Sequence, residues 1–476
     1  MQMRRLSDNI KATFFLGIAS FVTSGINYIT TPIFTRLVST AEYGLISKYN
    51  SIYLILSVIA TLTLSRPGIL SVGLYEHKEN RWEYLSIMLG EVLAASSITF
   101  LIVSIAWRPI LGKVLNNIPF RLIILAIVSC AIMPAMTFWT YKQRYEYKWK
   151  STFFVSVCTA ILAQLVSIGA VIICKGRTNY NLGEVRLFSV AAVNLLASLT
   201  IYFFIIKKGK RFVNLNIWKG TLIFALPLIP HYFGFALLTG TDKIMIGYMM
   251  GDDKAGIYSL AAVISTVGAL LWQALCVSVT PFVYEKLGER NYRIIDSLTK
   301  PLLELVGLFC IIISFLSPEI IAILGTNEYS NAAYVIPAAA AGTFMHVLYD
   351  LFSNVAFFNK KPIHIMIATL IAAATNVILN YFFINSYGYV AAGYTTLFSY
   401  LVLAILHYII SRKLEKEIIF DWKYDVILSL IVIAMCLSAM PLYGFYIIRY
   451  FIVVAICVAI LLRRNKYIEA IGGMRI

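Results

Sequence analysis

Several ionisable residues lie inside long apolar runs of this sequence. Asp242 and Lys243 fall within residues 220–250, and His346 and Asp350 fall within residues 335–358. A charge in a membrane-spanning helix is costly, so such residues usually bind a polar substrate, bind an ion or pass on a proton. The sequence therefore predicts transport chemistry, and the helices that carry these groups must position them.

His346 and Asp350 are one helical turn apart and can touch. Thr343 and Asn354 extend the same face of the predicted helix. One interpretation is a proton relay, which makes Asp350 and His346 candidates for ion coupling. The other is a structural hydrogen bond that holds two lobes together.

Asp242 and Lys243 are neighbours in sequence but lie about 100° apart around a helix. Asp242 shares its face with His231, whereas Lys243 lies over Tyr232. The two charges therefore meet different surroundings. Both are candidates for the wall of a substrate cavity, and Lys243 is the better candidate for contact with an anionic cargo.

Residues on either side of Asp242 predict where its helix bends and where the next helix begins. Pro227 and Pro230 predict a bend in its helix, because proline removes a backbone donor and clashes with the preceding turn. Asp252 and Asp253 follow Gly251 and are expected to begin the next helix, where acidic residues complement the helix dipole.

Two basic residues mark the ends of the predicted helix 43–65. Lys48 lies about one turn inside it and Arg66 follows its other end. Lys48 either extends to the membrane interface or points a cation into a cavity, and the neighbouring Ser47 and Ser51 favour the cavity. Arg66 either meets an anionic substrate or anchors in lipid headgroups.

A polar stripe runs along residues 10–35. Its members share one helical face with Gly17, and the other faces are apolar: Thr13, Ser20, Ser24, Asn27, Thr31 and Thr35. Such a stripe either lines a water-accessible cavity or packs against another helix through small side chains and hydrogen bonds. Asn27 is the candidate residue for a cavity wall.

The composition places these helices in a membrane. The chain has 476 residues, 60% of them apolar and only 13% charged, whereas soluble domains are nearer half apolar and a quarter charged. About fourteen runs are long enough to cross a hydrocarbon core. They span roughly 10–35, 43–65, 85–107, 119–140, 152–174, 187–206, 220–250, 255–280, 301–323, 335–358, 364–385, 390–411, 425–443 and 445–462. We therefore expect an all-α polytopic membrane protein, because backbone groups in lipid must form their hydrogen bonds within each segment.

The net charge of +17 sets the orientation. Most Lys and Arg residues fall in alternate loops, which the positive-inside rule assigns to the cytoplasm together with both termini. The excess charge is therefore a topology signal, and no basic face of the kind that binds nucleic acid stands out.

The sequence repeats after about 212 residues. AEYGLIS (41–47) then falls on DKAGIYS (253–259), and Glu91 meets Glu304 with an offset of one. The repeated glutamates suggest a role in the fold, such as pairing with a neighbouring base.

This duplication predicts two parallel six-helix lobes, residues 1–211 and 212–424. Residues 425–476 add two more helices and a cytoplasmic tail. Parallel repeats favour a transporter whose lobes rock about a substrate site between them, giving alternating access.

Enzyme activity is not expected. The longest loop on the predicted periplasmic side, residues 175–186, is too short for a catalytic domain, and no Gly-rich phosphate loop, HExxH, CxxC or GxSxG motif is present. The seven cysteines lie within the apolar runs or at their edges. They are expected to act as small core residues, so we expect no metal site.

Two longer motifs carry a family resemblance. They are TDKIMIGYMMG...AGIYSLAAVIS (241–265) and FTRLVSTAEYGLISKYNSI (34–52). They resemble the helix 7–8 and helix 1–2 motifs of Wzx-type flippases for O-antigen and capsule repeat units, which are polysaccharide transporters of the multidrug/oligosaccharidyl-lipid/polysaccharide (MOP) exporter superfamily. Val38-Ser39 stands where that family often has Gly-Pro. The resemblance extends over about residues 5–465.

The resemblance implies a cargo, a location and partners. The cargo is an oligosaccharide linked by pyrophosphate to undecaprenol, moved from the cytoplasmic to the periplasmic leaflet of a bacterial inner membrane. Lys48, Arg66 and Lys243 match the places where related flippases carry cavity cations, which suit a pyrophosphate in a low-dielectric cleft. Membrane lipids and other glycan-assembly proteins are the further partners implied.

No cofactor is implied, and a proton or sodium gradient is the candidate driving force. The alternative is a cation-coupled drug or metabolite antiporter of the same superfamily. The commonest antiporter arrangement places an acid in the first helix, and residues 10–35 contain none. Asp350 keeps that alternative open.

Overall fold

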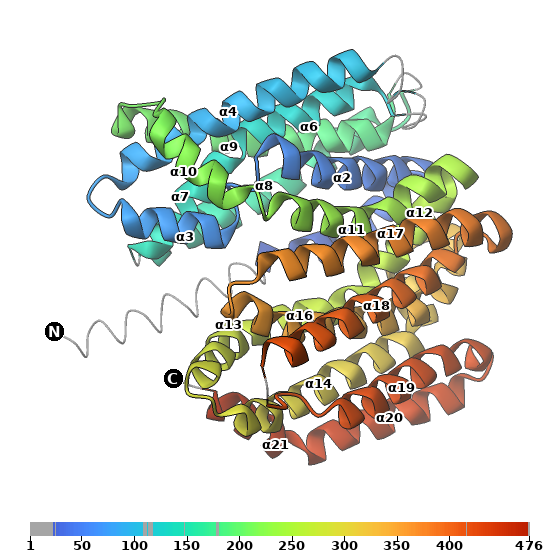
Figure 1. The fold of residues 1–476 in the computed structure, drawn as a ribbon. Coiled ribbons are helices and arrows are strands. Elements are labelled where there is room, and N and C mark those ends of the chain that lie inside the picture. Colours follow the sequence, from blue (N-terminus) through green and yellow to red (C-terminus); the bar gives the residue numbers. More distant parts are fainter. Residues whose placement is uncertain are drawn as a thin grey trace. The chain divides into compact units, whose positions relative to one another are not determined.

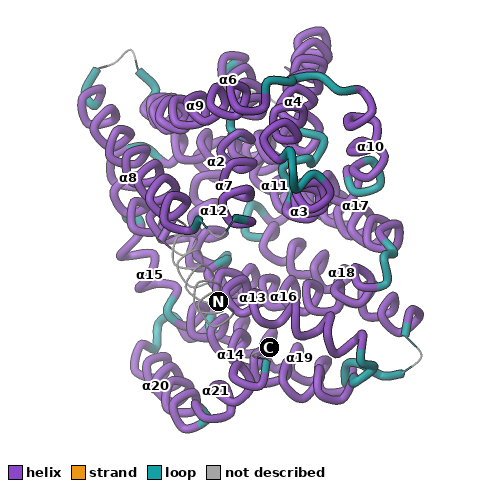
Figure 2. Tube along the Cα trace, turned by 90° about the vertical axis from the view of Figure 1, so that its left-hand side faces the viewer, coloured by secondary structure: helices purple, strands orange, loops and turns teal. Residues whose placement is uncertain are grey.

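Residues 22–23, 25–107, 112, 118–146, 148–177, 180–415 and 417–474 are described in a computed structural model (Figure 1). Within these residues every regular element is an α-helix or a short 3₁₀ helix (Figure 2). The expected all-α class is confirmed. The described residues from 25 to 37 are helical, as predicted for the first span.

Many of these helices are long and apolar enough to cross a membrane. Among the described residues, 9 helices meet that condition by length and composition, or up to 12 if each bent pair is one span. The figure of about fourteen spans stays a prediction.

The chain forms two compact units. The N-terminal unit comprises residues 1–240 and 251–253, and the C-terminal unit comprises residues 241–250 and 254–476. The division falls inside one helix, α11 (Ile229–Met250). The first part of α11 belongs to the N-terminal unit and its last ten residues belong to the C-terminal unit. The lobe boundaries at residues 211 and 424 stay a prediction.

The N-terminal unit is built from nine helices or parts of helices within the described residues, besides residues 25–37. They are α2 (Thr40–Ala60), α3 (Pro67–Glu76), α4 (Arg81–Ala106), α6 (Phe120–Ile132), α7 (Pro134–Tyr145), α8 (Trp149–Cys174), α9 (Leu182–Gly209), α10 (Leu215–Ala225) and the start of α11. A core of fully or nearly buried side chains from α3, α4, α7 and α9, including Leu70, Met88 and Phe138, lies beneath the turn that joins α2 to α3.

The C-terminal unit surrounds one buried helix, α16 (Ile336–Phe358), most of whose side chains are buried. Its other elements are α12 (Asp252–Ser265), α13 (Val267–Gly288), α14 (Tyr292–Phe315), α15 (Ser317–Leu324), η2 (Asn327–Tyr334), α17 (Pro362–Tyr387), α18 (Ala391–Leu414), α19 (Trp422–Ser438), η3 (Met440–Leu442), α20 (Tyr446–Leu462) and α21 (Arg464–Gly473). Helices α13, α14, α18 and α19 pack against α16.

Glycines allow α16 and α18 to approach closely along their length. A Cβ atom on Gly342 of α16 would lie 3.2 Å from the Cα of Leu397, and one on Gly393 of α18 would lie 3.2 Å from the carbonyl oxygen of Val335. The beginnings of the two helices therefore lie side by side, and polar residues at similar depths along them can meet.

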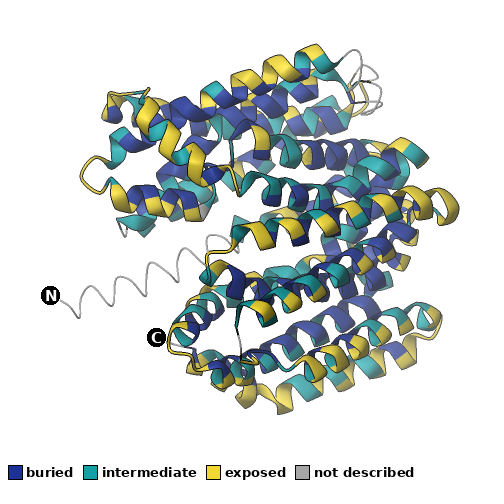
Figure 3. Cartoon of the chain, viewed as in Figure 1, coloured by how far each residue is buried: buried dark blue, intermediate teal, exposed yellow. Residues whose placement is uncertain are grey.

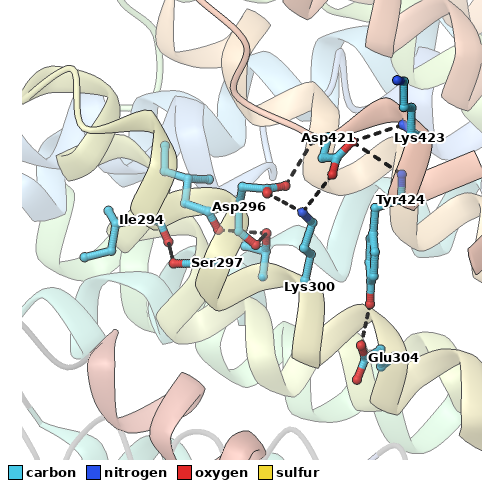
Figure 4. Close-up of polar contacts among 10 residues, drawn as sticks. Ile294, Asp296, Ser297, Lys300, Glu304, Asp421, Lys423 and Tyr424 are labelled. Atoms are coloured by element: carbon cyan, nitrogen blue, oxygen red, sulfur yellow. Dashed lines mark hydrogen bonds and ion pairs between the residues drawn. The ribbon is translucent and has the colours of Figure 1, made fainter.

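The additional C-terminal helices are fastened to α14 by a charged cluster (Figure 4). Lys300 bridges Asp296 at 2.6 Å and Asp421 at 3.2 Å, and the Tyr424 hydroxyl donates to Glu304 at 2.5 Å. Arg463 and Lys466 also pair with Glu304. Glu304 thus has the basic partners expected of it.

Glu91, the counterpart of Glu304 in the first repeat, has a different partner. It is buried on α4 and accepts a hydrogen bond from the Thr221 hydroxyl of α10 at 2.7 Å. In both units the glutamate of this helix thus contacts a helix that packs on it. In the N-terminal unit this partner is a hydroxyl and not the base that we expected.

Exposed residues lie along the outer sides of the helices (Figure 3), and many of them are large and apolar, as lipid contact requires. On α20, Phe451 and Leu462 are 74% and 80% exposed. As expected, Asp252 and Asp253 occupy the first turn of α12. Ser39 and Glu42 form a capping box at the start of α2. α10 and α11 meet at a bend of 55° beside Pro227 and Pro230.

Candidate functional site

A strained turn positions Arg66 in the N-terminal unit. After α2 ends at Ala60, Leu62 and Thr63 adopt left-handed backbone angles, with φ of 50° and 58°. This conformation costs a residue other than glycine about 1–3 kcal/mol and persists only where packing enforces it. The next residue, Leu64, is fully buried in the core and supplies that packing. The turn thereby ends on Arg66, the residue that precedes α3.

The Arg66 guanidinium lies on an aromatic surface. Its carbon is 4.3 Å from the centre of the Tyr232 ring, a distance at which a cation is attracted to the face of the ring. His231, which is buried, lies beside Tyr232 with ring centroids 5.0 Å apart. Both aromatic residues come from the first turn of α11, directly after the proline bend.

A second guanidinium lies in the same region. Arg144 on α7 lies over the Tyr141 ring, 5.5 Å from its centre, and Arg66 is within electrostatic reach of Tyr141 and His231. We call these five residues the Arg66–Arg144 cluster. It draws on the α2–α3 turn, α7 and α11, all within the N-terminal unit.

These two arginines have no carboxylate partner among the described residues of their unit, and Nε of Arg144 is buried with no hydrogen-bond partner there. Other cations of the unit are paired, for example Lys142 with Glu146 and Arg121 with Glu184. Two guanidinium groups without counter-ions form a place where an anion with several oxygens would be stabilised.

Lys48 is placed differently from either interpretation of the sequence. It is only 2% exposed and forms an ion pair with Asp252, the residue that begins α12. It therefore neither extends to the interface nor offers a free cation. Within the N-terminal unit its charge is used to fasten α2 to the start of α12.

Asn27 is exposed, and its side-chain oxygen accepts a hydrogen bond from Gln164 on α8 at 3.0 Å. Thr31 and Thr35 are buried and donate to carbonyl oxygens of their own helix. The described part of the polar stripe thus combines interhelical and local hydrogen bonds. Thr13, Gly17, Ser20 and Ser24 lie outside the described residues.

Asp242 is 4% exposed and lies at the centre of a polar cluster in the C-terminal unit. Its carboxylate accepts hydrogen bonds from the Tyr258 hydroxyl at 2.6 Å, the Asn380 amide at 2.6 Å and the Thr396 hydroxyl at 2.7 Å. Asn376 bonds to Asn380 and Thr396, so four helices meet here. Three neutral donors thus satisfy this carboxylate, and its place in the wall of a substrate cavity stays a prediction.

Lys243 is half-buried and does not share these contacts. Within its own unit no described carboxylate comes within ion-pair distance of its amine, although Asp242 lies within electrostatic reach. The expectation that the two neighbours meet different surroundings is therefore confirmed. The role of Lys243 in binding cargo stays a prediction.

His346 and Asp350 lie on α16, inside the C-terminal unit. Asp350 accepts a hydrogen bond from the Trp272 indole at 2.8 Å and contacts the Cys276 thiol at 3.4 Å, both on α13. The His346 ring lies against Tyr400 of α18, with centroids 5.2 Å apart. These partners of Asp350 and His346 lie on α13 and α18 of the same unit. The proton relay and the structural bond between lobes both stay predictions.

Sequence reasoning missed several members of these clusters. Arg144 lies in a stretch rich in Lys, Arg and Tyr (YKQRYEYKWK, 141–150), where no spacing distinguishes it from its neighbours. Tyr258 lies within the motif at residues 241–265, and no other feature of the sequence marks it as a partner of Asp242. Asn376 and Asn380, which lie in the polar cluster around Asp242, share a helical face. Helical periodicity could therefore identify these two residues from the sequence.

Two family models match overlapping parts of the chain. Residues 10–283 match the family model described as polysaccharide biosynthesis protein, which is more than half of the sequence. The chain belongs to the polysaccharide biosynthesis protein family. Residues 227–382 of the chain also match the MatE family model, in keeping with the MOP superfamily resemblance.

Two curated relatives are similar over part of the chain. The probable low-salt glycan biosynthesis flippase Agl15 of Haloferax volcanii is 26% identical over 171 residues, which cover 35% of this chain and 36% of that protein. The Lsg locus putative protein 1 of Haemophilus influenzae is 28% identical over 166 residues, 33% of this chain and 41% of that protein. The alignments thus cover less than half of either relative.

A solved structure extends the similarity of fold to nearly the whole chain. The lipid II flippase MurJ in an inward closed conformation superposes with a TM-score of 0.65 at 15% identity, covering 96% of this chain and 99% of that one. The chain therefore has the fold of this flippase, and with the two family matches it belongs to the MOP superfamily.

Proposed function

We propose that this protein is a flippase for a lipid-linked oligosaccharide, and that it catalyses no covalent step. The Arg66–Arg144 cluster is the observation that carries the proposal. Its two guanidinium groups lack carboxylate partners within the described part of their unit, and an anion would compensate them. Tyrosine and histidine rings around them supply apolar and polar contacts for adjoining sugar or lipid.

The cargo that best fits such a cluster is an undecaprenyl-pyrophosphate-linked repeat unit of the O-antigen or capsule type. A pyrophosphate presents several oxygens to two planar guanidinium groups, which bind it better than point-like ammonium groups would. Family membership and the flippase named among the relatives support this choice. Transport from the cytoplasmic to the periplasmic leaflet of the inner membrane, with both termini cytoplasmic, completes the proposal.

The experiment starts with deletion of the gene in its host. We expect surface glycan to disappear and lipid-linked repeat units to accumulate. Plasmid-borne Arg66→Ala and Arg144→Ala should each restore less than about a tenth of wild-type export, because a charged hydrogen bond in such a site contributes about 1.5–3 kcal/mol. Arg→Lys should restore export in part. Lys150→Ala, at an exposed cation of the same unit, is the matched control.

A cation-coupled antiporter is the second candidate, favoured by the MatE match over the part of the chain that contains Asp242. Unchanged surface glycan together with reduced dye efflux in the deletion strain would favour it. Wild-type export by both arginine variants at normal protein levels would remove the Arg66–Arg144 cluster from the cargo site. Lys243→Ala, tested alongside, should lower export if its amine also meets the cargo.

A further inference from the structure

A group of exposed cations lies where α9 leads into α10 in the N-terminal unit. Lys207 and Lys208 belong to the last turn of α9, Lys210 and Arg211 follow it, and Lys219 lies on α10. All five side chains are exposed. We call these five residues the basic patch.

The basic patch carries more unbalanced charge than membrane orientation requires. Acids contribute little to orientation, so the positive-inside rule does not explain why residues 185–241 contain no Asp or Glu. Other predicted cytoplasmic loops with three or more basic residues also contain an acid. In two of them Glu146 pairs with Lys142, and Glu289 pairs with Lys286.

Within the described part of the N-terminal unit, the basic patch has little internal compensation. Arg211 is its one member with a carboxylate contact there, to Glu83 at 3.6 Å, and both side chains remain partly in water. Lys207 and Lys208 complement the C-terminal end of the α9 dipole, but this effect does not extend beyond the last turn to Lys219. Most of the positive charge is therefore left for a partner.

The backbone of the basic patch is held closely against α4. A Cβ atom on Gly209 would lie 2.4 Å from the Cβ of Ser86, and one on Gly90 of α4 would lie 2.1 Å from the carbonyl oxygen of Phe212. Between these contacts Lys210 has a left-handed backbone with φ of 62°, a conformation usually left to glycine or asparagine. The cations are thus mounted on a packed turn, in contrast to those of a flexible tail.

Helix α10 extends the patch with an apolar outer face (Figure 3). Hydrogen bonds from Trp218 and Thr221 fasten its inner side to α4. Its outer side carries four large apolar side chains that are between 39% and 70% exposed: Leu215, Leu222, Ile223 and Leu226. Lys219 lies in the middle of this face, within an arc of about 100°, and its long side chain can reach from apolar surroundings to water.

The length and direction of α10 suit a membrane surface. Its 11 residues extend about 16 Å, roughly half of a 30 Å hydrocarbon core. The 22 residues of α11 extend about 33 Å and are long enough to cross that core. The two helices meet at a bend of 55°, so α10 departs from the direction of α11. A short helix with an apolar face and several cations is typical of helices that lie in the membrane interface.

We propose that the basic patch and the outer face of α10 bind anionic phospholipids of the cytoplasmic leaflet. The cations contact the anionic headgroups, and the acyl chains cover the apolar face of α10. A zwitterionic lipid offers the same acyl chains without net charge, so the surface selects lipids such as phosphatidylglycerol. This proposal goes beyond cargo transport and does not depend on it, because lipid contact is measured without transport.

The test uses the full-length protein in phosphatidylcholine vesicles that contain a trace of photoactivatable lipid. This probe is either phosphatidylglycerol or phosphatidylcholine with a diazirine on one acyl chain, and mass spectrometry locates its adducts after illumination. On residues 212–226 we expect phosphatidylglycerol to be favoured about fivefold, the factor that one cation near an anionic surface contributes. Residues 161–173 of α8, which contain no cation, should react equally with both lipids.

Two variants with the same change in net charge separate the basic patch from the charge of the whole protein. The test variant combines Lys207→Gln, Lys208→Gln, Lys210→Gln and Lys219→Gln. The matched control changes four other exposed cations of the unit, and combines Lys78→Gln, Lys150→Gln, Lys175→Gln and Arg177→Gln. We expect the test variant to lose the preference and the control to keep it. Unchanged phosphatidylcholine adducts on residues 212–226 show that α10 is still in place, and arginine at the four test positions should keep the preference.

Several results would overturn the proposal. Equal reaction of the two lipids with wild-type residues 212–226, or no adducts there from either lipid, shows that α10 is not an anionic-lipid surface. A preference that survives in the glutamine variant of the basic patch assigns it to other charges. A preference that inorganic phosphate removes, and that chloride at equal ionic strength leaves, assigns the patch to free phosphate.

Discussion

Charges inside the described helices are stabilised in three different ways, and the difference separates structural residues from candidate functional ones. Lys48 is neutralised by an ion pair, and Asp242 is surrounded by neutral donors. Arg66 and Arg144 lie on aromatic rings. Of these three arrangements, only the last leaves positive charge for an anionic ligand to neutralise, which is why the cargo site is placed there.

The Lys48–Asp252 pair should be a stability element. Removing one partner leaves a charge largely out of water, so Lys48→Met and Asp252→Asn should each destabilise the protein by about 3 kcal/mol, the low end for a buried pair. The double variant should be more stable than the sum of the two changes predicts. Thermal unfolding in detergent measures this, with Lys150→Met as the exposed control. Additive losses would contradict the pairing and return Lys48 to the list of cargo residues.

Glu146 should make stability depend on pH. Burial by itself raises the pKa of Glu146, but the hydrogen bonds and charges of Lys142 and Lys148 outweigh burial and hold this pKa below its usual value. A lowered folded-state pKa contributes stability above the ordinary pKa of glutamate, and this stability is lost as the pH falls through the folded-state pKa. We therefore expect acid to lower the thermal midpoint of the wild type more than that of Glu146→Gln.

Glu146→Gln should also be the less stable protein at neutral pH, since Lys142 is only 3% exposed and would lose its counter-ion. A loss of about 2 kcal/mol is expected, because Glu146 itself is partly solvated. Glu83→Gln removes a more exposed carboxylate from a looser contact with Arg211 and serves as the control. Equal midpoints for the two variants at every pH would refute this role of Glu146.

At the scale of elements, the informative features are breaks in helices. The left-handed residues after α2 place Arg66, and the proline bend between α10 and α11 places His231 and Tyr232. Each of these two breaks positions residues of the Arg66–Arg144 cluster. An uninterrupted helix would carry the same side chains to other depths, so the irregular segments build the site.

Straightening the bend before α11 should impair transport more than folding. Replacing Pro227 and Pro230 by leucine supplies two backbone donors. It also removes the penalty of up to about 3 kcal/mol that each proline would impose on a continuous helix. Folded yield should therefore be kept and flipping should fall. Spin labels at Lys219 and Leu237, on either side of the 55° bend, should move apart in the double variant. Pro301→Leu in α14 is the control. An unchanged label distance would show that packing, rather than proline, sets the bend.

At the scale of the whole molecule, charge distribution should orient the chain in the membrane. The +17 net charge is concentrated in the loops assigned to the cytoplasm. Alkaline phosphatase, which is active only outside the cytoplasm, should be active when fused after residue 177 and inactive when fused after residue 414. A green fluorescent protein should give the opposite result at these sites. The reverse pattern, or equal signals, would contradict the orientation and with it the proposed direction of transport.

The sequence by itself determined the features that depend on near neighbours along the chain. Hydropathy determined the helices, the capping box at Ser39 follows from a hydroxyl and a carboxylate three residues apart, and the bend follows from Pro227 and Pro230. Family membership could also be anticipated, because the motifs around residues 34–52 and 241–265 are contiguous. Each of these signals acts over a few residues, where spacing along the chain specifies geometry.

Only the tertiary structure decided which charges are paired. Lys48 and Asp252 are far apart in sequence, as are Arg66 and Arg144, or Asp242 and Thr396, and helical periodicity gives a shared face but not the neighbour that this face meets. In a medium of low dielectric constant the partner determines whether a charge supports the fold, binds a ligand or exchanges a proton. For this reason the sequence identified Asp242 and Lys48 as costly residues, and only packing assigned one to a hydrogen-bonded cluster and the other to an ion pair.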